Sequence, residues 1–427
     1  MNHVENPLKS LQRFLSAARQ PRAARPAIWF AGAAAALTLL NGCSKGYNSG
    51  SYLPMTSPPA GPVTTISALN TIKNLASAVD PINGDSNPYG LAITPASYNG
   101  LDGSGNTAVL RPGDLIISDF SNRTGANIGT SLLRYTPSTN TIAHYYTEAI
   151  GSGPVAVAIS GKGATWISNY QPHYSNPGDG TTSGDGNVVV ITPDGTDFPA
   201  PAGIVDNNSG ATFVPASNMF AGPWGQAFGQ KAGSTTPYFF VANVDSNMGW
   251  VQREAFAAPA FNKLTATTIA VLPTGSNAFD PTGPQGMVYD SKTDILYVAS
   301  STDSTIWAIP NATTSAGSST PGVAVYQGMP LNSPLGITLN PINGDLIVAN
   351  QLDNNLVEVS PNPQVQGSTY GFSSKLVGTK LVDTAAVNAT LGTGSALFGV
   401  VATQDSAGNL MVYFVDANTN SLDLLAK

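Results

Sequence analysis

The stretch PLGITLNPINGDLIVANQLDNNLVEVSP, residues 334–361, holds the pattern that decides the fold. It begins with Pro-Leu-Gly, runs through a short apolar segment, turns at Asn-Gly, and continues through a second apolar segment that ends at Asn350. A third apolar segment follows at residues 356–359. Short apolar runs separated by Pro, Gly, Asn and Asp are typical of antiparallel strands joined by tight turns. The stretch therefore predicts three consecutive strands.

The same unit recurs six times along the chain. The copies begin at Asn87, Gly153, Gly222, Gly283, Ser333 and Ala396, and their second strands end at Asp119, Asn169, Asn243, Ser300, Asn350 and Asp416. Successive starts are 50 to 69 residues apart, which leaves room for a fourth strand in each unit. Small antiparallel sheets repeated in this way bury their faces by packing radially. We therefore predict an all-β chain with a six-bladed β-propeller over residues 62–427.

The two ends of the repeat region predict how the ring closes. The last copy stops after its third strand at Lys427, whereas residues 63–72 (VTTISALNTI) precede the first copy and have no blade of their own. An open array of sheets would expose strand edges that promote aggregation. We expect residues 63–72 to supply the missing outer strand of the last blade.

The fifth copy resembles the repeat of NHL-type six-bladed propellers. The resemblance rests on Pro-x-Gly-Ile, the Asn-Gly-Asp turn, Val-Ala-Asn and the closing apolar strand of residues 334–361, and in weaker form it covers residues 85–427. Asn replaces the usual Asp at Asn169, Asn243 and Asn350, and Ser300 replaces it in the fourth copy. The resemblance implies a propeller. It does not imply a function that depends on the aspartate carboxylate, because four copies lack it.

The N-terminal segment predicts export and lipid attachment. Residues 1–26 carry five basic side chains, and residues 27–40 (AIWFAGAAAALTLL) form an apolar run too short to span a bilayer comfortably. Leu-Asn-Gly before Cys43 resembles the lipobox of bacterial lipoproteins, in which the cysteine is acylated. We predict a signal peptide at 1–42, lipidation of Cys43 and a flexible tether at 43–61. The alternative is an uncleaved anchor or an internal buried helix in which Cys43 is an incidental thiol. Ser44, by resemblance to lipoprotein sorting signals, favours the outer membrane of a Gram-negative bacterium.

The net charge of the chain indicates which classes of partner the protein could bind. The formal net charge is −7, and removing residues 1–42 leaves 13 basic against 24 acidic side chains, or about −11. Binding to nucleic acid needs clustered Lys and Arg, so we expect no nucleic-acid partner. A cationic ligand or a metal ion is favoured instead.

Candidate ligand-binding residues gather on one face of the expected ring. In a propeller, the loop before each inner strand and the loop after each second strand emerge on the same face, around the channel. This arrangement places Tyr89, Trp224 and Gln285 near Asp119, Asn169, Asn243, Asn350 and Asp416. Aromatic and amide groups around a channel are suited to binding a ligand. The alternative is that the polar residues only hydrogen-bond the turns that follow them.

These residues leave two functions open. The first is a non-enzymatic ligand-binding or scaffold module at the cell envelope, anchored to the membrane by lipid and engaging a protein, a small molecule or a glycan. The alternative is a metal-dependent lactonase or hydrolase of the gluconolactonase type, with Asp119 and Asp416 as candidate Ca²⁺ ligands. That resemblance implies a glutamate ligand, yet Glu148, Glu254 and Glu358 all lie outside the loops that precede inner strands. We therefore favour the non-enzymatic hypothesis, and catalytic residues are unknown.

Overall fold

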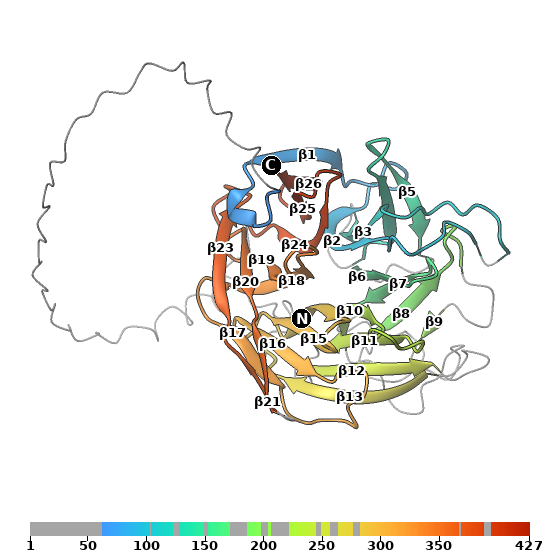
Figure 1. Ribbon diagram of the computed structural model, residues 1–427. Helices are drawn as coiled ribbons and strands as arrows, with labels where there is room; N and C mark the ends of the chain where they lie inside the picture. The colour runs from blue at the N-terminus through green and yellow to red at the C-terminus, as the bar shows by residue number, and fades with distance from the viewer. Residues whose placement is uncertain are drawn as a thin grey trace, which may run out of the picture. The chain divides into compact units, whose positions relative to one another are not determined.

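A computed structural model describes residues 62–102, 104–122, 128–148, 153–170, 186–197, 204–205, 222–244, 249–256, 264–275, 282–366, 369–387 and 394–427. These residues belong to the unit Ala60–Lys427. They form six four-stranded antiparallel sheets arranged around a central axis (Figure 1). Each innermost strand contacts the innermost strand of the next blade, and the last contacts the first, so the ring is closed. This arrangement confirms the predicted six-bladed β-propeller.

The strands follow the predicted order in every blade. Blade 1 consists of β2 (Ser86–Ile93), β3 (Leu115–Ser121), β4 (Ser131–Thr136) and β5 (Thr141–Thr147). Blade 2 consists of β6 (Pro154–Ile159), β7 (Thr165–Asn169), β8 (Asn187–Ile191) and β9 (Ile204–Val205). Blade 3 consists of β10 (Pro223–Gly229), β11 (Tyr238–Asn243), β12 (Gly249–Phe256) and β13 (Leu264–Leu272).

Blades 4 to 6 complete the ring. Blade 4 consists of β14 (Pro284–Asp290), β15 (Ile295–Ser300), β16 (Thr305–Pro310) and β17 (Val323–Gln327). Blade 5 consists of β18 (Pro334–Leu339), β19 (Leu346–Asn350), β20 (Asn355–Ser360) and β23 (Lys375–Leu381), with an inserted hairpin of β21 (Pro363–Gln366) and β22 (Thr369–Phe372). Blade 6 consists of β24 (Leu397–Gln404), β25 (Leu410–Asp416), β26 (Ser421–Ala426) and the N-terminal strand β1 (Thr71–Ser77).

Strand β1 closes the ring as predicted, but it lies further along the chain than expected. It pairs with β26, from Thr71 opposite Ala426 to Ser77 opposite Ser421. The preceding residues instead form the short 3-10 helix η1 (Ile66–Ala68), because Ile66 and Leu69 are fully buried against blades 5 and 6. The predicted strand at 63–72 is therefore wrong in its bounds and correct in its role.

Polar contacts fasten the segment around η1 to blade 5. The backbone N–H of Ile66 donates to Glu358 Oε2 at 2.8 Å, and the other carboxylate oxygen accepts from Asn340 Nδ2 at 2.8 Å. Asn340 Nδ2 also donates to the carbonyl oxygen of Thr64, and Lys380 Nζ donates to that of Leu69. The N-terminal segment thus completes blade 6 with a strand and is held to blade 5 by side chains.

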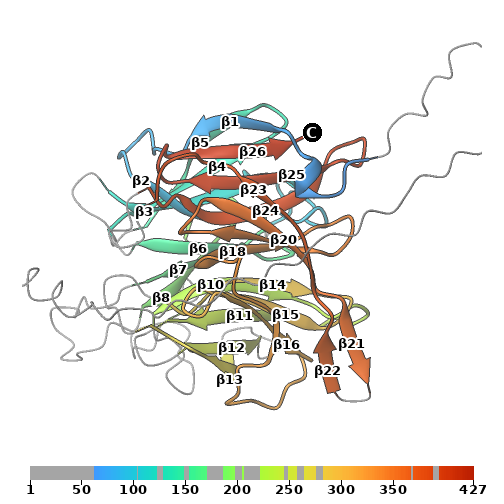
Figure 2. The same cartoon turned by 90° about the vertical axis from the view of Figure 1, so that its left-hand side faces the viewer.

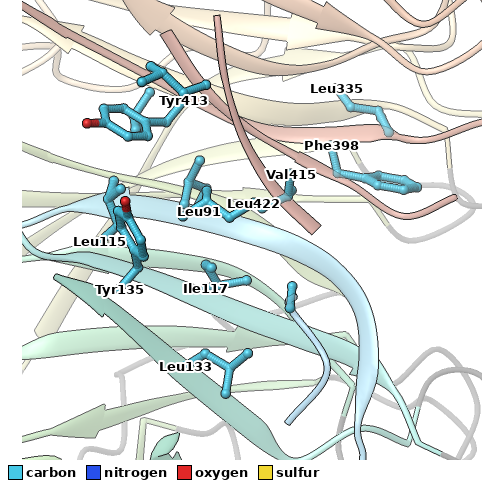
Figure 3. Close-up of a cluster of buried hydrophobic side chains, with 13 residues drawn as sticks. Leu91, Leu115, Ile117, Leu133, Tyr135, Leu335, Phe398, Tyr413, Val415 and Leu422 are labelled. Atoms are coloured by element: carbon cyan, nitrogen blue, oxygen red, sulfur yellow. The ribbon is translucent and has the colours of Figure 1, made fainter. Parts of the chain in front are cut away.

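The core is divided among the interfaces between neighbouring blades. Figure 3 shows the cluster between blades 6 and 1, in which Leu91, Leu115 and Ile117 of blade 1 pack near Tyr413 and Val415 of blade 6. Strand β1 of blade 6 continues through residues 78–85 into β2 of blade 1, so this cluster packs two blades that the chain also connects, and the ring is closed without a covalent link inside blade 6, between β1 and β26. Each Å² of apolar surface that this packing removes from water stabilises the folded protein by about 25 cal/mol.

The ring has two distinct faces. We call the face that carries the loops before inner strands and after second strands the mouth face, and the opposite face the hairpin face. The turns 340–345 and 405–409 lie on the hairpin face, where Val63 exchanges backbone and side-chain hydrogen bonds with Asn409 and Leu410. Figure 2 shows the C-terminus and the start of β1 on the same side of the ring. Both ends of the described chain therefore lie on the hairpin face.

No helix among the described residues is long and apolar enough to cross a membrane. The predicted signal peptide, Cys43 and the tether all lie outside the described residues.

The contacts of Glu358 predict the effect of removing its side chain. Glu358→Ala leaves the Ile66 N–H without its acceptor and removes one acceptor of Asn340, which should lower the free energy of unfolding by about 2–4 kcal/mol. Denaturant unfolding of the chain measures this loss. Gln404→Ala, at an exposed position at the end of β24, is the control and should change stability little. Equal stability of Glu358→Ala and the parent protein would contradict the fastening role.

Candidate functional site

One residue of each inner strand is turned toward the mouth of the channel by a β-bulge. In all six blades the strand pairing shifts register near the start of the inner strand, as between Pro334 and Gly336 in β18 and between Pro88 and Gly90 in β2. A bulge adds one residue on one strand and redirects its side chain. The bulged residues that follow these positions are Tyr89, Val155, Trp224, Gln285, Leu335 and Phe398, and all six line the central cavity.

Aromatic side chains occupy about half of this ring. The Tyr89 ring stacks on Phe398 with centroids 3.7 Å apart and on Phe120 with centroids 4.4 Å apart. Trp224 continues the group, 6.0 Å from Tyr89 and 5.1 Å from Tyr170. Tyr89 is half-buried and the other four rings are buried. We call Tyr89, Phe120, Tyr170, Trp224 and Phe398 the aromatic arc.

The channel below the aromatic arc is narrow. The space in it that water can occupy is about 80 Å³, enough for a few small molecules such as water. Its wall is made of the inner strands, where a glycine in five of the six blades allows close approach of the next strand. Gln226 Nε2 donates to the carbonyl oxygen of Ala156 at 3.0 Å across two blades. The channel therefore has no room for a molecule larger than a few water molecules.

The polar residues at the ends of the second strands lie one strand outward from the bulged residues. Each is buried, and none lines the cavity: Asp119, Asn169, Asn243, Ser300, Asn350 and Asp416. Asn350 Nδ2 donates to the carbonyl oxygen of Pro330 at 2.7 Å, and Asp416 Oδ1 accepts from the N–H groups of Asn418 and Thr419. Asn169 Nδ2 donates to Asn187 Oδ1 at 2.8 Å. These contacts fit the alternative in which such residues hold the following turns.

Asp119 differs from its counterparts. It is fully buried, and among the described residues neither carboxylate oxygen has a hydrogen-bond partner. Burial raises its pKa well above the usual range, and the nearby charges of Asp80 and Asp85 raise it further. Burial also raises the pKa of Asp416. The surroundings of Asp119 therefore favour the neutral form of its carboxyl group.

The two candidate Ca²⁺ ligands belong to different groups of side chains. The carboxylates that affect the pKa of Asp119 are Asp80 and Asp85, whereas Asp383 affects that of Asp416. Among the described residues, no three His, Cys, Asp or Glu side chains are grouped so that they could hold a metal ion. Within this part of the chain, nothing brings Asp119 and Asp416 together around one cation.

Sequence reasoning gave no role to Glu254, and the structure places it inside a blade interface. Glu254 lies on β12 opposite Phe239 and Ala266, so it faces the apolar cluster that contains Trp166. It is fully buried, no described residue forms a hydrogen bond with its carboxylate, and burial raises its pKa to about 8. The third strands have irregular polar patterns, so only the three-dimensional contacts reveal that this acid is buried between blades 2 and 3.

The burial of Glu254 predicts a pH dependence of stability. Because its pKa is about 8 in the folded protein and near 4.5 when unfolded, its favourable contribution is complete below about pH 4.5 and is lost as the pH rises through 8. Glu254→Gln should flatten the fall in melting temperature between about pH 5 and pH 9 and raise it at the alkaline end. Calorimetry of both proteins across this range checks the prediction, and parallel curves would contradict it.

Comparison with known proteins gives similarity of fold only. No protein-family model matches the chain, and no curated protein sequence matches it. A structure of a nidogen/laminin complex is 12% identical, with 74% of this chain and 85% of that chain covered and a TM-score of 0.43. A catalytically inactive virginiamycin B lyase from Staphylococcus aureus is 11% identical, with 84% and 99% covered and a TM-score of 0.42. The β-propeller domain of Cps50 (Swd1) from Myceliophthora thermophila is 9% identical, with 80% and 97% covered and a TM-score of 0.42. At these identities and scores, no activity or partner carries over to this chain.

Proposed function

We propose that the chain is a lipid-anchored, NHL-like propeller of the bacterial cell envelope that binds a ligand or protein partner at its mouth face. The observation that carries the proposal is the ring of bulged residues, which brings three aromatic side chains and one amide to the mouth. Tyr89 is half-buried and offers part of its ring for contact, and the buried Phe398 stacked on it holds that ring in place, which limits the loss of conformational entropy on binding. The narrow channel directs recognition to the surface around the aromatic arc.

The position of the N-terminal segment supports attachment from the opposite face. Residues 62–70 lie on the hairpin face, so a tether that ends at Cys43 would join the ring there. Nineteen residues rich in Gly, Ser and Pro have a root-mean-square span of about 25 Å. With acylation of Cys43, the hairpin face lies nearer the membrane on average and the mouth face is presented away from it.

No observation on the described residues favours the lactonase alternative. That activity needs oxygen ligands converging on a metal at the mouth, whereas Asp119 and Asp416 are buried one strand outward in separate groups. A stoichiometric Ca²⁺ that is lost in both Asp119→Ala and Asp416→Ala would support the alternative and contradict the non-enzymatic proposal.

A quenching experiment tests the anchor and the orientation together. Cys43 is the only cysteine, so a lipidated chain has no other thiol, and one fluorophore can be placed by Ser406→Cys on the hairpin face or Thr302→Cys on the mouth face. Both positions are exposed. In vesicles with spin-labelled lipid, the dye at residue 406 should be quenched more strongly than the dye at residue 302.

The controls for this experiment are direct. Cys43→Ala should abolish fatty-acid labelling and membrane association. Equal quenching at the two positions would contradict the orientation, and membrane association that survives Cys43→Ala would contradict the lipid anchor.

A further inference from the structure

The junction between blades 2 and 3 differs from the other junctions at the wall of the channel. Ala156 of β6 stands where the other inner strands carry glycine, and Gln226 of β10 stands where they carry an apolar residue. The apolar residues at this second position are Leu91, Val157, Met287, Ile337 and Val400. Ala156 and Gln226 both line the cavity, and Gln226 Nε2 donates to the carbonyl oxygen of Ala156 at 3.0 Å. Two departures from the repeat therefore meet at one junction.

The amide oxygen of Gln226 has no donor in the described part of the chain. Gln226 is only 7% exposed, and no described residue forms a hydrogen bond with its Oε1. Since the amide nitrogen is bonded at the cavity wall, the oxygen of the same amide group lies beside the cavity as well. A buried carbonyl oxygen without a donor is costly, and few polar groups of native proteins are left in that state. Gln226 therefore needs a small hydrogen-bond donor.

Ser168 of β7 has the same need. It lies opposite Ala156, on the side of β7 that carries Trp166 and faces blade 3, and no described residue forms a hydrogen bond with its fully buried Oγ. Blade 1 shows the cause, because there the N–H of Gly90 donates to Ser118 Oγ at 2.9 Å, and a Cβ atom at Gly90 would lie 2.5 Å from that oxygen. Ala156 carries such a Cβ atom. This explains why Ser168 lacks the hydrogen bond that Ser118 makes.

We propose that the junction of blades 2 and 3 binds an ordered water molecule that bridges Gln226 Oε1 and Ser168 Oγ. Both side chains adjoin Ala156, the first through the carbonyl oxygen of Ala156 and the second as its partner between β6 and β7. A water molecule can donate one hydrogen to each oxygen, and buried waters in proteins commonly join such groups. This site is separate from the proposed binding at the mouth face. It joins the two blades where alanine replaces the glycine of the repeat.

The size and the charge of the channel favour water over other ligands. The space of about 80 Å³ exceeds the roughly 10–15 Å³ that one water molecule needs, and it leaves no room for a larger polar molecule. None of the described residues that line the channel is charged. A cation would therefore lose its hydration without a carboxylate to balance its charge.

The same junction contains further buried oxygen atoms that no described residue satisfies. Gln252 lies across β11 from Gln226, with Val241 between them, and Glu254 follows two residues later on the same face. Gln252 Oε1 and both carboxylate oxygens of Glu254 have no hydrogen-bond partner among the described residues. With those of Ser168 and Gln226, five such oxygens gather at one of the six junctions. This gathering supports water within the junction.

A crystal structure of the mature chain, at a resolution that shows ordered water, tests the site directly. We expect a water-sized peak about 2.7–3.2 Å from both Gln226 Oε1 and Ser168 Oγ. A map without a peak at this place would overturn the inference. A metal ion there, recognised by shorter distances of about 2.3–2.6 Å to the oxygens, would overturn it as well.

Magnetic relaxation dispersion of the water oxygen, which counts long-lived internal waters, tests the site in solution. Gln226→Met installs the residue that blade 4 carries at this position, and it should lower the count by at least one. Met287→Leu, the matched change in blade 4, should leave the count unchanged. An unchanged count in Gln226→Met, or an equal loss in both variants, would overturn the inference. If Gln226→Met does not fold, the peak in the parent structure decides the question.

Discussion

The close approach of six inner strands around the channel is the constraint on which the rest of the structure depends. Gly90, Gly225, Gly286, Gly336 and Gly399 occupy equivalent places, and Ala156 replaces glycine in blade 2. A Cβ atom at Gly399 would lie 2.7 Å from the carbonyl oxygen of Tyr89, and one at Gly336 would overlap that of Phe398. Only the absence of a side chain lets each inner strand contact the next blade so closely. The ring size, the narrow channel and the burial of the blade interfaces all follow from this approach.

The same constraint shapes the mouth and the closure of the ring. Pro-x-Gly places the glycine against the next blade, and the bulge turns the residue between them toward the channel axis. The bulged residues therefore line the channel, three of them with aromatic rings. Because both chain ends lie in blade 6, the ring stays closed only if β1 and the contacts of Glu358 hold the N-terminal segment in place. The proposed binding at the mouth and the proposed attachment at the hairpin face would thus use opposite ends of the same strands.

Repetition explains how much of this structure could be predicted from the sequence. The six copies, the polar ends of their second strands and the closing role of the N-terminal segment follow from local patterns that recur at intervals. The bounds of β1 could not be derived, because η1 is held by Glu358, 292 residues away from Ile66. Local patterns also cannot distinguish a polar residue that lines the channel from one that hydrogen-bonds a nearby loop. Asn350 belongs to the second kind. Nor can local patterns show that Glu254 is buried between two blades. Tyr89, Trp224 and Gln285, three of the six bulged residues, could be assigned to the channel from the sequence because each precedes a glycine that the repeat marks.

Unfolding of glycine variants measures the central constraint most directly. Gly336→Ala adds a methyl group at the contact between blades 5 and 6, whereas Gly371→Ala adds one in the hairpin β21–β22, where nothing lies within 4 Å. Guanidinium unfolding should show a loss of about 1–3 kcal/mol or more for Gly336→Ala and almost none for Gly371→Ala. Equal stability of the two variants would contradict the account, because the inner strands would then not depend on the absence of a side chain at the channel.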